Sequence, residues 1–380
     1  MLFKKKKSSE MEVPIQTSSQ RASRSDLFDF ESFVPSFASL GMYEALRESI
    51  PVIDAAITKT VRLTGGYEVH CKNAHADKLL QDFIKSVSVG GNCEGLFSFT
   101  DSYFDQLLTF GTAVGEIVVQ NGKIAGLYNA PLRNIELHRS SDGFGCEVWT
   151  GTPVRKPVKY PELILVSALN PSPGKLCGTS ILHGLPFVSS VLMKIYNAVG
   201  QNWDRAGNIR FAVTYKPSAE ASDRAYAKER AVQVAREWSE VMQSGNKIKD
   251  FVTVGDVSIK AIGADAPIPD SDIPVRQMLE QIVAKTGIPP FMLGLSWSST
   301  ERMSSQQADV LTSELEAYRR LLSPVILKIC RTFLRLCAVT DEPEITWNDI
   351  TLQDETELAK ARLYDAQAKQ LLQSRKEEII

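Results

Sequence analysis

Residues 273–324 constrain the fold of this 380-residue chain more than any other stretch. They begin with a short amphipathic helix, which ends at Gly287 and the two prolines that follow, because proline cannot continue a helix. Next come a small apolar segment, Phe291–Gly294, and a loop rich in serine and threonine, 296–305. The stretch therefore predicts a helix, an apolar plug and a polar loop, followed by a second helix.

The second helix is predicted to be the longest in the chain, over Met303–Ala338. Its large apolar residues recur at steps of three and four and form one continuous stripe, which is typical of a buried helix face. Pro324 interrupts the stripe, and we expect a kink there. The stripe consists of Leu311, Leu315, Tyr318, Leu322, Val325, Ile329, Phe333 and Leu336.

Composition sets the outer limits. With 43% hydrophobic and 23% charged residues, the chain has enough apolar material for two or three modest packed domains. A formal net charge of −2 argues against a protein that grips duplex DNA through a broad basic face. No apolar run reaches the roughly 18–20 residues that span a bilayer, and no apolar segment follows Lys4–Lys7 as it would in a secretory signal. The six cysteines form no C-x-x-C pair, which favours free thiols in a reducing compartment.

The first half of the chain changes from helical to strand periodicity near Gly111. Helices are predicted over 41–63, 77–87 and 97–110, and strands follow from Thr112 onward. Asn121-Gly122 is a typical hairpin turn between strands 112–119 and 124–128. Further strands are expected at 134–138, 144–149 and 162–166, so this half predicts an α+β block that ends near Gly178.

A small α/β insertion is predicted between two long helices. Helix 185–205 precedes it. The insertion consists of strand 210–215, amphipathic helix 221–242 and a hairpin of strands 251–254 and 257–262. The hairpin is expected to turn at Gly255-Asp256. On helix 221–242, one side is charged and the other is predicted to carry Val232, Ala235 and Trp238.

A search for catalytic chemistry favours a protein without an active site. No phosphate-binding loop is present, and Ser296 does not lie in a G-x-S-x-G elbow. His70, Cys71 and His75 have the composition of a metal site, but strand alternation puts His70 and Cys71 on opposite faces. We therefore expect no catalytic residue, no metal and no cofactor.

The polar loop has two interpretations that the residues leave open. Most loops of this kind are only connectors. This loop also carries Trp297 and Arg302, and an exposed tryptophan near an arginine offers stacking and phosphate contact to a nucleic acid.

The pieces described above resemble, in order, those of bacteriophage portal proteins of siphophages with HK97-like capsids. The resemblance is carried by the GIPP-FMLG segment with its flanking helices, by LLTFGTAVGEIVV at 107–119, and by ELILVSALNPSPGKLCGTSIL at 162–182. Portal proteins usually have G-x-S-P-L at the end of the last segment. This chain has Gly178-Thr179-Ser180-Ile181-Leu182 instead, a departure that concerns only the start of the next helix.

The resemblance implies an α+β portal fold with these parts. They are a flexible N-terminal arm (1–36), a wing (37–180), a first stem helix (181–208), a clip (209–270), a second stem helix (271–294), a tunnel loop (295–305), a long wing helix (306–345) and a C-terminal crown (346–380).

The resemblance also implies function. Portal proteins form a ring at one capsid vertex, usually a dodecamer, through which double-stranded DNA passes without sequence-specific contact. Expected partners are further copies of the chain, the terminase large subunit, a head–tail adaptor, and the major capsid and scaffold proteins, with no membrane involved. The expected location is the virion, after assembly in the cytoplasm of a bacterial host. The DNA-facing residues would be Trp297, Ser298, Ser299, Thr300 and Arg302, and the clip residues that bind partners would be Arg224, Lys228, Glu229 and Arg236.

Two other classes remain open. One is a capsid-associated adaptor or other nucleic-acid-binding structural protein, which would be monomeric rather than a ring. The other is an enzyme that uses the α+β block, which would need a pocket with converging titratable groups.

Overall fold

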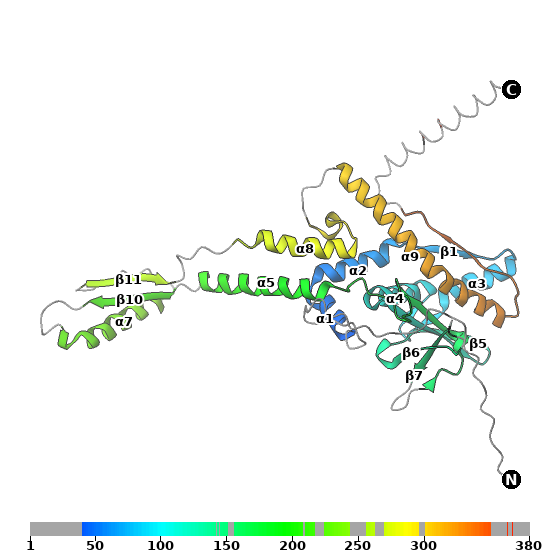
Figure 1. The fold of residues 1–380 in the computed structure, drawn as a ribbon, viewed down its shortest axis with the longest axis horizontal. Helices are drawn as coiled ribbons and strands as arrows, with labels where there is room; N and C mark the ends of the chain where they lie inside the picture. Colours follow the sequence, from blue (N-terminus) through cyan, green and yellow to red (C-terminus); the bar gives the residue numbers. More distant parts are fainter. Residues whose placement is uncertain are drawn as a thin grey trace, which may run out of the picture. The chain divides into compact units, whose positions relative to one another are not determined.

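The computed structural model describes residues 40–141, 143, 145–150, 156–207, 210–216, 224–243, 256–262, 270–295, 301–350, 363 and 367. The chain divides into two compact units, and Figure 1 labels most helices and several strands of the two units. The first unit combines Met1–Ser189 with Glu280–Ile380, and the second is Ser190–Leu279. Helices and strands are mixed in both, which confirms the predicted α+β class.

The first unit is built around helix α4 (Leu96–Phe110), whose side chains are buried on several sides. Packed with it are α1 (Leu40–Ser49), α2 (Pro51–Leu63), α3 (Ala74–Ser86) and α9 (Glu301–Leu336). Pro51 occupies the first turn of α2, where a missing N–H costs nothing. The predicted helices at 41–63, 77–87 and 97–110 are confirmed, with the first divided in two at Ile50.

A five-stranded sheet lies against α4, in the order β3-β2-β5-β4-β9. Its strands are β2 (Ser88–Val89), β3 (Cys93–Glu94), β4 (Thr112–Gln120), β5 (Lys123–Asn129) and β9 (Ile164–Ala168). The predicted hairpin between β4 and β5 is confirmed. Asn121 and Gly122 both have positive φ, at 54° and 73°, as a two-residue turn of this type requires.

Two smaller sheets complete the first unit. One of them consists of β6 (Ile135–Arg139), β7 (Cys146–Thr150) and β8 (Lys156–Pro157). In the sequence, the short helix η2 (Leu132–Asn134) precedes this sheet and the short helix η3 (Pro161–Leu163) follows it. The other sheet pairs β1 (Tyr67–His70) with β12 (Glu344–Trp347), antiparallel. The sequence analysis predicted neither β8 nor β12.

Helix α9 ties the C-terminal part of the chain to the first unit. It continues through Pro324, and most of the predicted stripe is buried, although Leu336 is 39% exposed. Phe333 stacks on Phe83 of α3, with ring centroids 4.1 Å apart. Arg319 is buried, and its Nε donates a hydrogen bond to the Thr64 carbonyl while its guanidinium lies over the Trp347 ring. Burial lowers the pKa of Arg319.

The second unit contains β10 (Arg210–Lys216), α7 (Ala227–Gln243) and β11 (Asp256–Ile262). Helix α5 (Leu185–Gly207) enters it from the first unit, and α8 (Asp272–Thr286) leaves it again. Strands β10 and β11 are antiparallel and pair from Arg210 with Ile262 to Lys216 with Asp256.

This pairing corrects the predicted hairpin. Asp256 lies in a strand and not in a turn, and β11 uses β10 as its partner. The other predicted strand, 251–254, lies outside the described residues. A correction also applies to α7: Val232 is 50% exposed and Ala235 is exposed, whereas Val234 is buried. The apolar pattern of α7 was too sparse to identify the buried side by counting.

Candidate functional site

The predicted tunnel loop is described only at its edges. Trp297, Ser298, Ser299 and Thr300 lie outside the described residues, and Arg302 is described only as backbone in the first turn of α9. The DNA-facing roles assigned to these side chains therefore stay predictions.

The structure does describe the frame on either side of that loop. Gly287 ends α8 with a φ of 73°, and the short helix η4 (Pro290–Leu293) ends at Gly294 with a φ of 75°. Ile288, just before η4, belongs to one buried cluster with Ala56 of α2 and with Leu311 and Leu315 of α9. Met292 and Leu293 of η4 pack against the same cluster. The segment before the loop and the helix after it are thus packed into a common core.

Two of the predicted clip residues share one exposed ridge of α7. Lys228, Val232 and Arg236 are exposed and follow one another at intervals of four residues, which places them on one side of the helix. Arg224 is exposed as well, but it lies before α7, which begins at Ala227. Glu229 is exposed next to Lys228. Val234 is buried and lies about 160° around the helix from Arg236, at roughly 100° per residue. We call the residues Lys228, Val232 and Arg236 the basic ridge.

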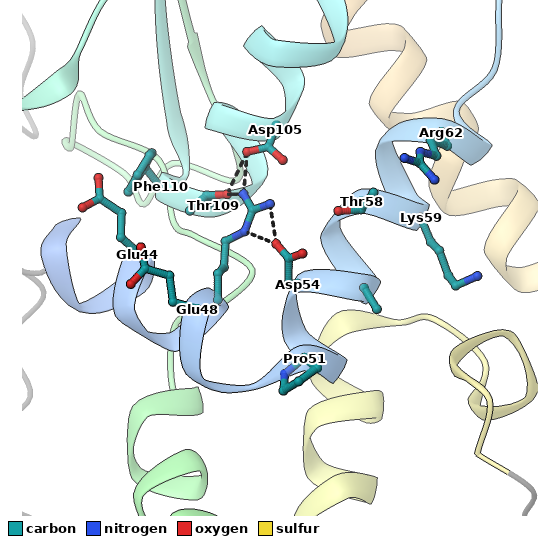
Figure 2. A pocket seen from close by; sticks show the side chains of 12 residues that line it. Glu44, Glu48, Pro51, Asp54, Thr58, Lys59, Arg62, Asp105, Thr109 and Phe110 are labelled. Carbon is teal, nitrogen blue, oxygen red and sulfur yellow. Dashed lines mark hydrogen bonds and ion pairs between the residues drawn. The ribbon is translucent and has the colours of Figure 1, made fainter.

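A large open cavity of about 870 Å³ lies among α1, α2 and α4 of the first unit. Arg47 of α1 is central to it, and the Nε of Arg47 donates a hydrogen bond to the carboxylate of Asp54 of α2 (2.8 Å). Nη1 of Arg47 donates to Asp105 (2.5 Å) and Thr109 (2.8 Å) of α4. Figure 2 shows Asp54, Asp105 and Thr109 converging on these bonds, while Lys59 points away from Asp105. The arginine thus connects three helices.

The electrostatics of this cavity indicate a structural role. Burial would lower the pKa of Arg47, but the hydrogen bonds and charges of Asp105 and Asp54 outweigh it and raise the pKa. A guanidinium held in this way stays charged and cannot exchange a proton near neutral pH. Glu44, also on the cavity wall, is paired with Arg133. The sequence analysis missed this network because its members lie 7, 58 and 62 residues apart.

The residues with metal-like composition are arranged differently from a metal site. The His70 ring contacts Asp77 (3.3 Å) and Glu68 (3.2 Å), and Asp77 also accepts a hydrogen bond from the Cys71 backbone N–H. Across the part of the chain that the structure describes, no group of three or more His, Cys, Asp or Glu residues could hold a metal ion. Within the same residues, no helix is long and apolar enough to cross a membrane.

The segment that departs from the portal pattern docks against the end of α4. The Ser180 hydroxyl donates to the Thr109 carbonyl (2.6 Å), and the Ile181 N–H donates to the Leu108 carbonyl (3.2 Å). Leu182 is completely buried. These contacts fix the entry into α5, which begins at Leu185 without the proline of the usual motif.

The sequence matches no protein-family model and no curated protein, whereas the fold matches solved structures. A chain of the virion of a native gene transfer agent (GTA) particle covers 89% of this chain and 90% of its own length, at TM-score 0.63 and 13% identity. A chain from the neck of the native GTA particle, computed with C12 symmetry, covers 83% of this chain and 85% of its own length, at TM-score 0.59 and 14% identity. An HK97-family phage portal protein from Corynebacterium diphtheriae covers 71% of this chain and 86% of its own length, with TM-score 0.41 and 12% identity.

The likeness to the GTA chains defines the fold. Along nearly its whole length, this chain has the fold of a component found in a virion and in its neck.

Proposed function

We propose that the chain is a portal protein, whose copies form a closed ring at one vertex of a capsid. In this proposal double-stranded DNA passes through the ring without sequence-specific contact. The observation that carries it is the fold shared with a chain from a neck computed with C12 symmetry, over more than four fifths of both chains. The same symmetry supports a ring of twelve copies. In this proposal the ring is part of the virion and is assembled in the cytoplasm of the host.

An exposed apolar face on α5 supports the ring. Met193 is 36% exposed, Tyr196 45% and Trp203 65%, and their spacing of three and seven residues puts them on one side of the helix. Large apolar side chains on one exposed helix face indicate a surface that another protein covers. In the proposed ring, a neighbouring copy covers this face.

The charge balance fits the passage of DNA. A net charge of −2 leaves no broad excess of cations that would hold phosphates tightly. The basic ridge provides a local positive surface, which fits an acidic patch on a protein partner. We assign this ridge to the terminase large subunit during packaging and to the head–tail adaptor afterwards, and the first unit to the major capsid and scaffold proteins.

The ring is tested by native mass spectrometry and negative-stain microscopy of the purified chain, with and without scaffold protein. We expect closed rings with a central channel. Trp203→Glu combined with Tyr196→Glu should reduce the fraction in rings by at least about tenfold, because each subunit contact would bury charge in an apolar interface. Gln201→Glu is the matched control, since position 201 lies on the other side of α5 and should leave the rings intact.

Species no larger than a dimer under all of these conditions would refute the ring. A stable monomer that binds capsids would instead favour a capsid-associated adaptor or another nucleic-acid-binding structural protein. The proposal assigns no catalytic residue, metal or cofactor to the chain.

The tunnel loop provides a second test within the same proposal. Arg302→Ala should leave rings intact and shorten the packaged DNA, because a phosphate contact is lost at the channel wall. Deletion of Ser298–Thr300 should act in the same direction. Arg302→Lys keeps the charge and should package nearly normally. Trp297 either presses on the DNA backbone or anchors the loop to a neighbouring copy.

The readout is the length of DNA protected from nuclease inside purified particles. Equal lengths in wild-type and Arg302→Ala particles would rule out the DNA contact. Loss of the ring itself would show that the loop has a structural role.

A further inference from the structure

A cavity of about 360 Å³ in the first unit lies where the described part of the chain begins. Leu40, the first described residue, forms part of its wall, together with Tyr43, Phe110, Leu132 and Ile135. Protein interiors contain few voids of such size, and an apolar cavity of about 150 Å³ already accommodates a benzene molecule. This cavity therefore has room for at least one aromatic side chain.

The apolar wall of the cavity belongs to the core of the first unit. Leu40, Leu132 and Ile135 lie in one buried cluster, and Phe110 packs against it. An aromatic group in the cavity would extend that cluster without exposing new surface. The lining of the cavity also has a polar part, which includes Lys175, Cys177 and His183.

We propose that the segment Phe33–Phe37 of the same chain docks in this cavity and anchors the N-terminal arm. The chain enters the cavity wall at Leu40, only three residues after Phe37, a distance of at most roughly 10 Å in extended chain. Such a short connection favours docking within one chain over exchange between copies.

The sequence of the segment suits this site. In an extended chain, alternate residues share one side, so Phe33, Pro35 and Phe37 present a continuous apolar edge. Pro35 also keeps the residue before it out of the helical region. Between residues 26 and 39 the ionisable side chains are Asp26, Asp29 and Glu31, all acidic, which complements Lys175 in the polar part of the lining.

This anchoring goes beyond the ring and does not depend on it. With residues 33–37 docked, the part of the arm left to contact other proteins is residues 1–32. A monomeric chain would show the same docking, so failure of the ring and failure of the docking are separate results.

Cross-linking tests the position of the segment directly. Ala38→Cys leaves both phenylalanines in place and puts a thiol next to Phe37 in the sequence, while the native Cys177 lines the cavity. Cys146→Ser removes a nearby thiol, whose own pKa is raised by burial and also by Cys177. With a short bismaleimide on the full chain, we expect a link between positions 38 and 177 within one chain, identified by peptide mass mapping.

Ser19→Cys is the distant control and should give no such link. A cross-linked band of twice the chain mass would show that the segment docks in a neighbouring copy, which overturns the proposal. No link at position 38 would overturn it as well.

Thiol accessibility gives an independent measurement. The double substitution of Phe33→Ser and Phe37→Ser should raise the rate at which maleimide labels Cys177 at least about tenfold. The reason is that burial of one phenyl group favours the docked segment over the undocked one by that factor or more. Phe28→Ser with Phe30→Ser removes the same amount of apolar surface from the part of the arm that precedes the segment and should leave the rate unchanged. Cys93 is exposed on β3 and serves as the internal reference. Equal labelling of Cys177 in wild type and both variants would refute the docking.

Discussion

Gly178→Ala will lower the free energy of unfolding of the first unit by about 3 kcal/mol or more. A Cβ atom at Gly178 would lie 2.1 Å from the Gly111 carbonyl oxygen and 2.3 Å from the Leu169 nitrogen. Both are backbone atoms, so no side-chain rotation can relieve the contact. The backbone itself would have to move.

Three hydrogen bonds depend on this close approach. The Leu169 N–H donates to the Gly111 carbonyl (2.8 Å), and the Thr179 N–H donates to the Leu169 carbonyl (2.6 Å). The Gly178 N–H donates to the Thr112 hydroxyl (2.9 Å). Each is worth about 1 kcal/mol, and overpacking adds about 1–3 kcal/mol. Because whole domains are stable by only about 5–15 kcal/mol, the loss would be large.

Two glycines provide matched controls for the same substitution. Gly174 has a φ of 78° and no atom within 4 Å of a built Cβ, so Gly174→Ala measures backbone strain alone, about 1–2 kcal/mol. Gly200 lies in the part of α5 that belongs to the second unit, with open space around it, and Gly200→Ala should stabilise that unit by about 1 kcal/mol. Urea unfolding followed by circular dichroism ranks the three variants. A Gly178→Ala variant as stable as Gly174→Ala would contradict the described packing.

Reversal of two charges on the basic ridge will abolish most tail joining while rings still form. In the proposed portal, Lys228→Glu with Arg236→Glu presents negative charge to a partner that fits a positive surface. Juxtaposed like charges cost several kcal/mol, so the yield of tailed, DNA-filled particles should fall by at least about tenfold. Neither side chain is buried, so the second unit itself should fold normally.

Lys85→Glu with Lys123→Glu is the control, because it makes the same change in net charge at exposed positions of the first unit. Particles are counted by electron microscopy, and ring mass is checked for both variants. Normal tail joining by the ridge variant would show that this face does not contact the partner.

Local pattern predicted most elements because it depends on neighbours in sequence. The stripe of α9, the proline in the first turn of α2 and the Asn121-Gly122 turn each need only a few adjacent residues, and all three agree with the structure. The fold that this chain shares with a GTA neck chain spans 83% of its length, so the match covers most of the predicted elements. The tunnel-loop roles stay predictions, since residues 296–300 lie outside the described part of the chain.

The sequence by itself thus determined which segments become helices, where β4 turns into β5, and that 41–110 is mainly helical. Only the tertiary structure decided that β11 pairs with β10, that β12 pairs with β1, and that Val234 rather than Val232 is buried on α7. It also decided that Arg47 joins three helices and that Gly178 packs against Gly111. The reason is physical: periodicity and turn chemistry act over a few residues, whereas these contacts join positions that become neighbours only when the chain has folded.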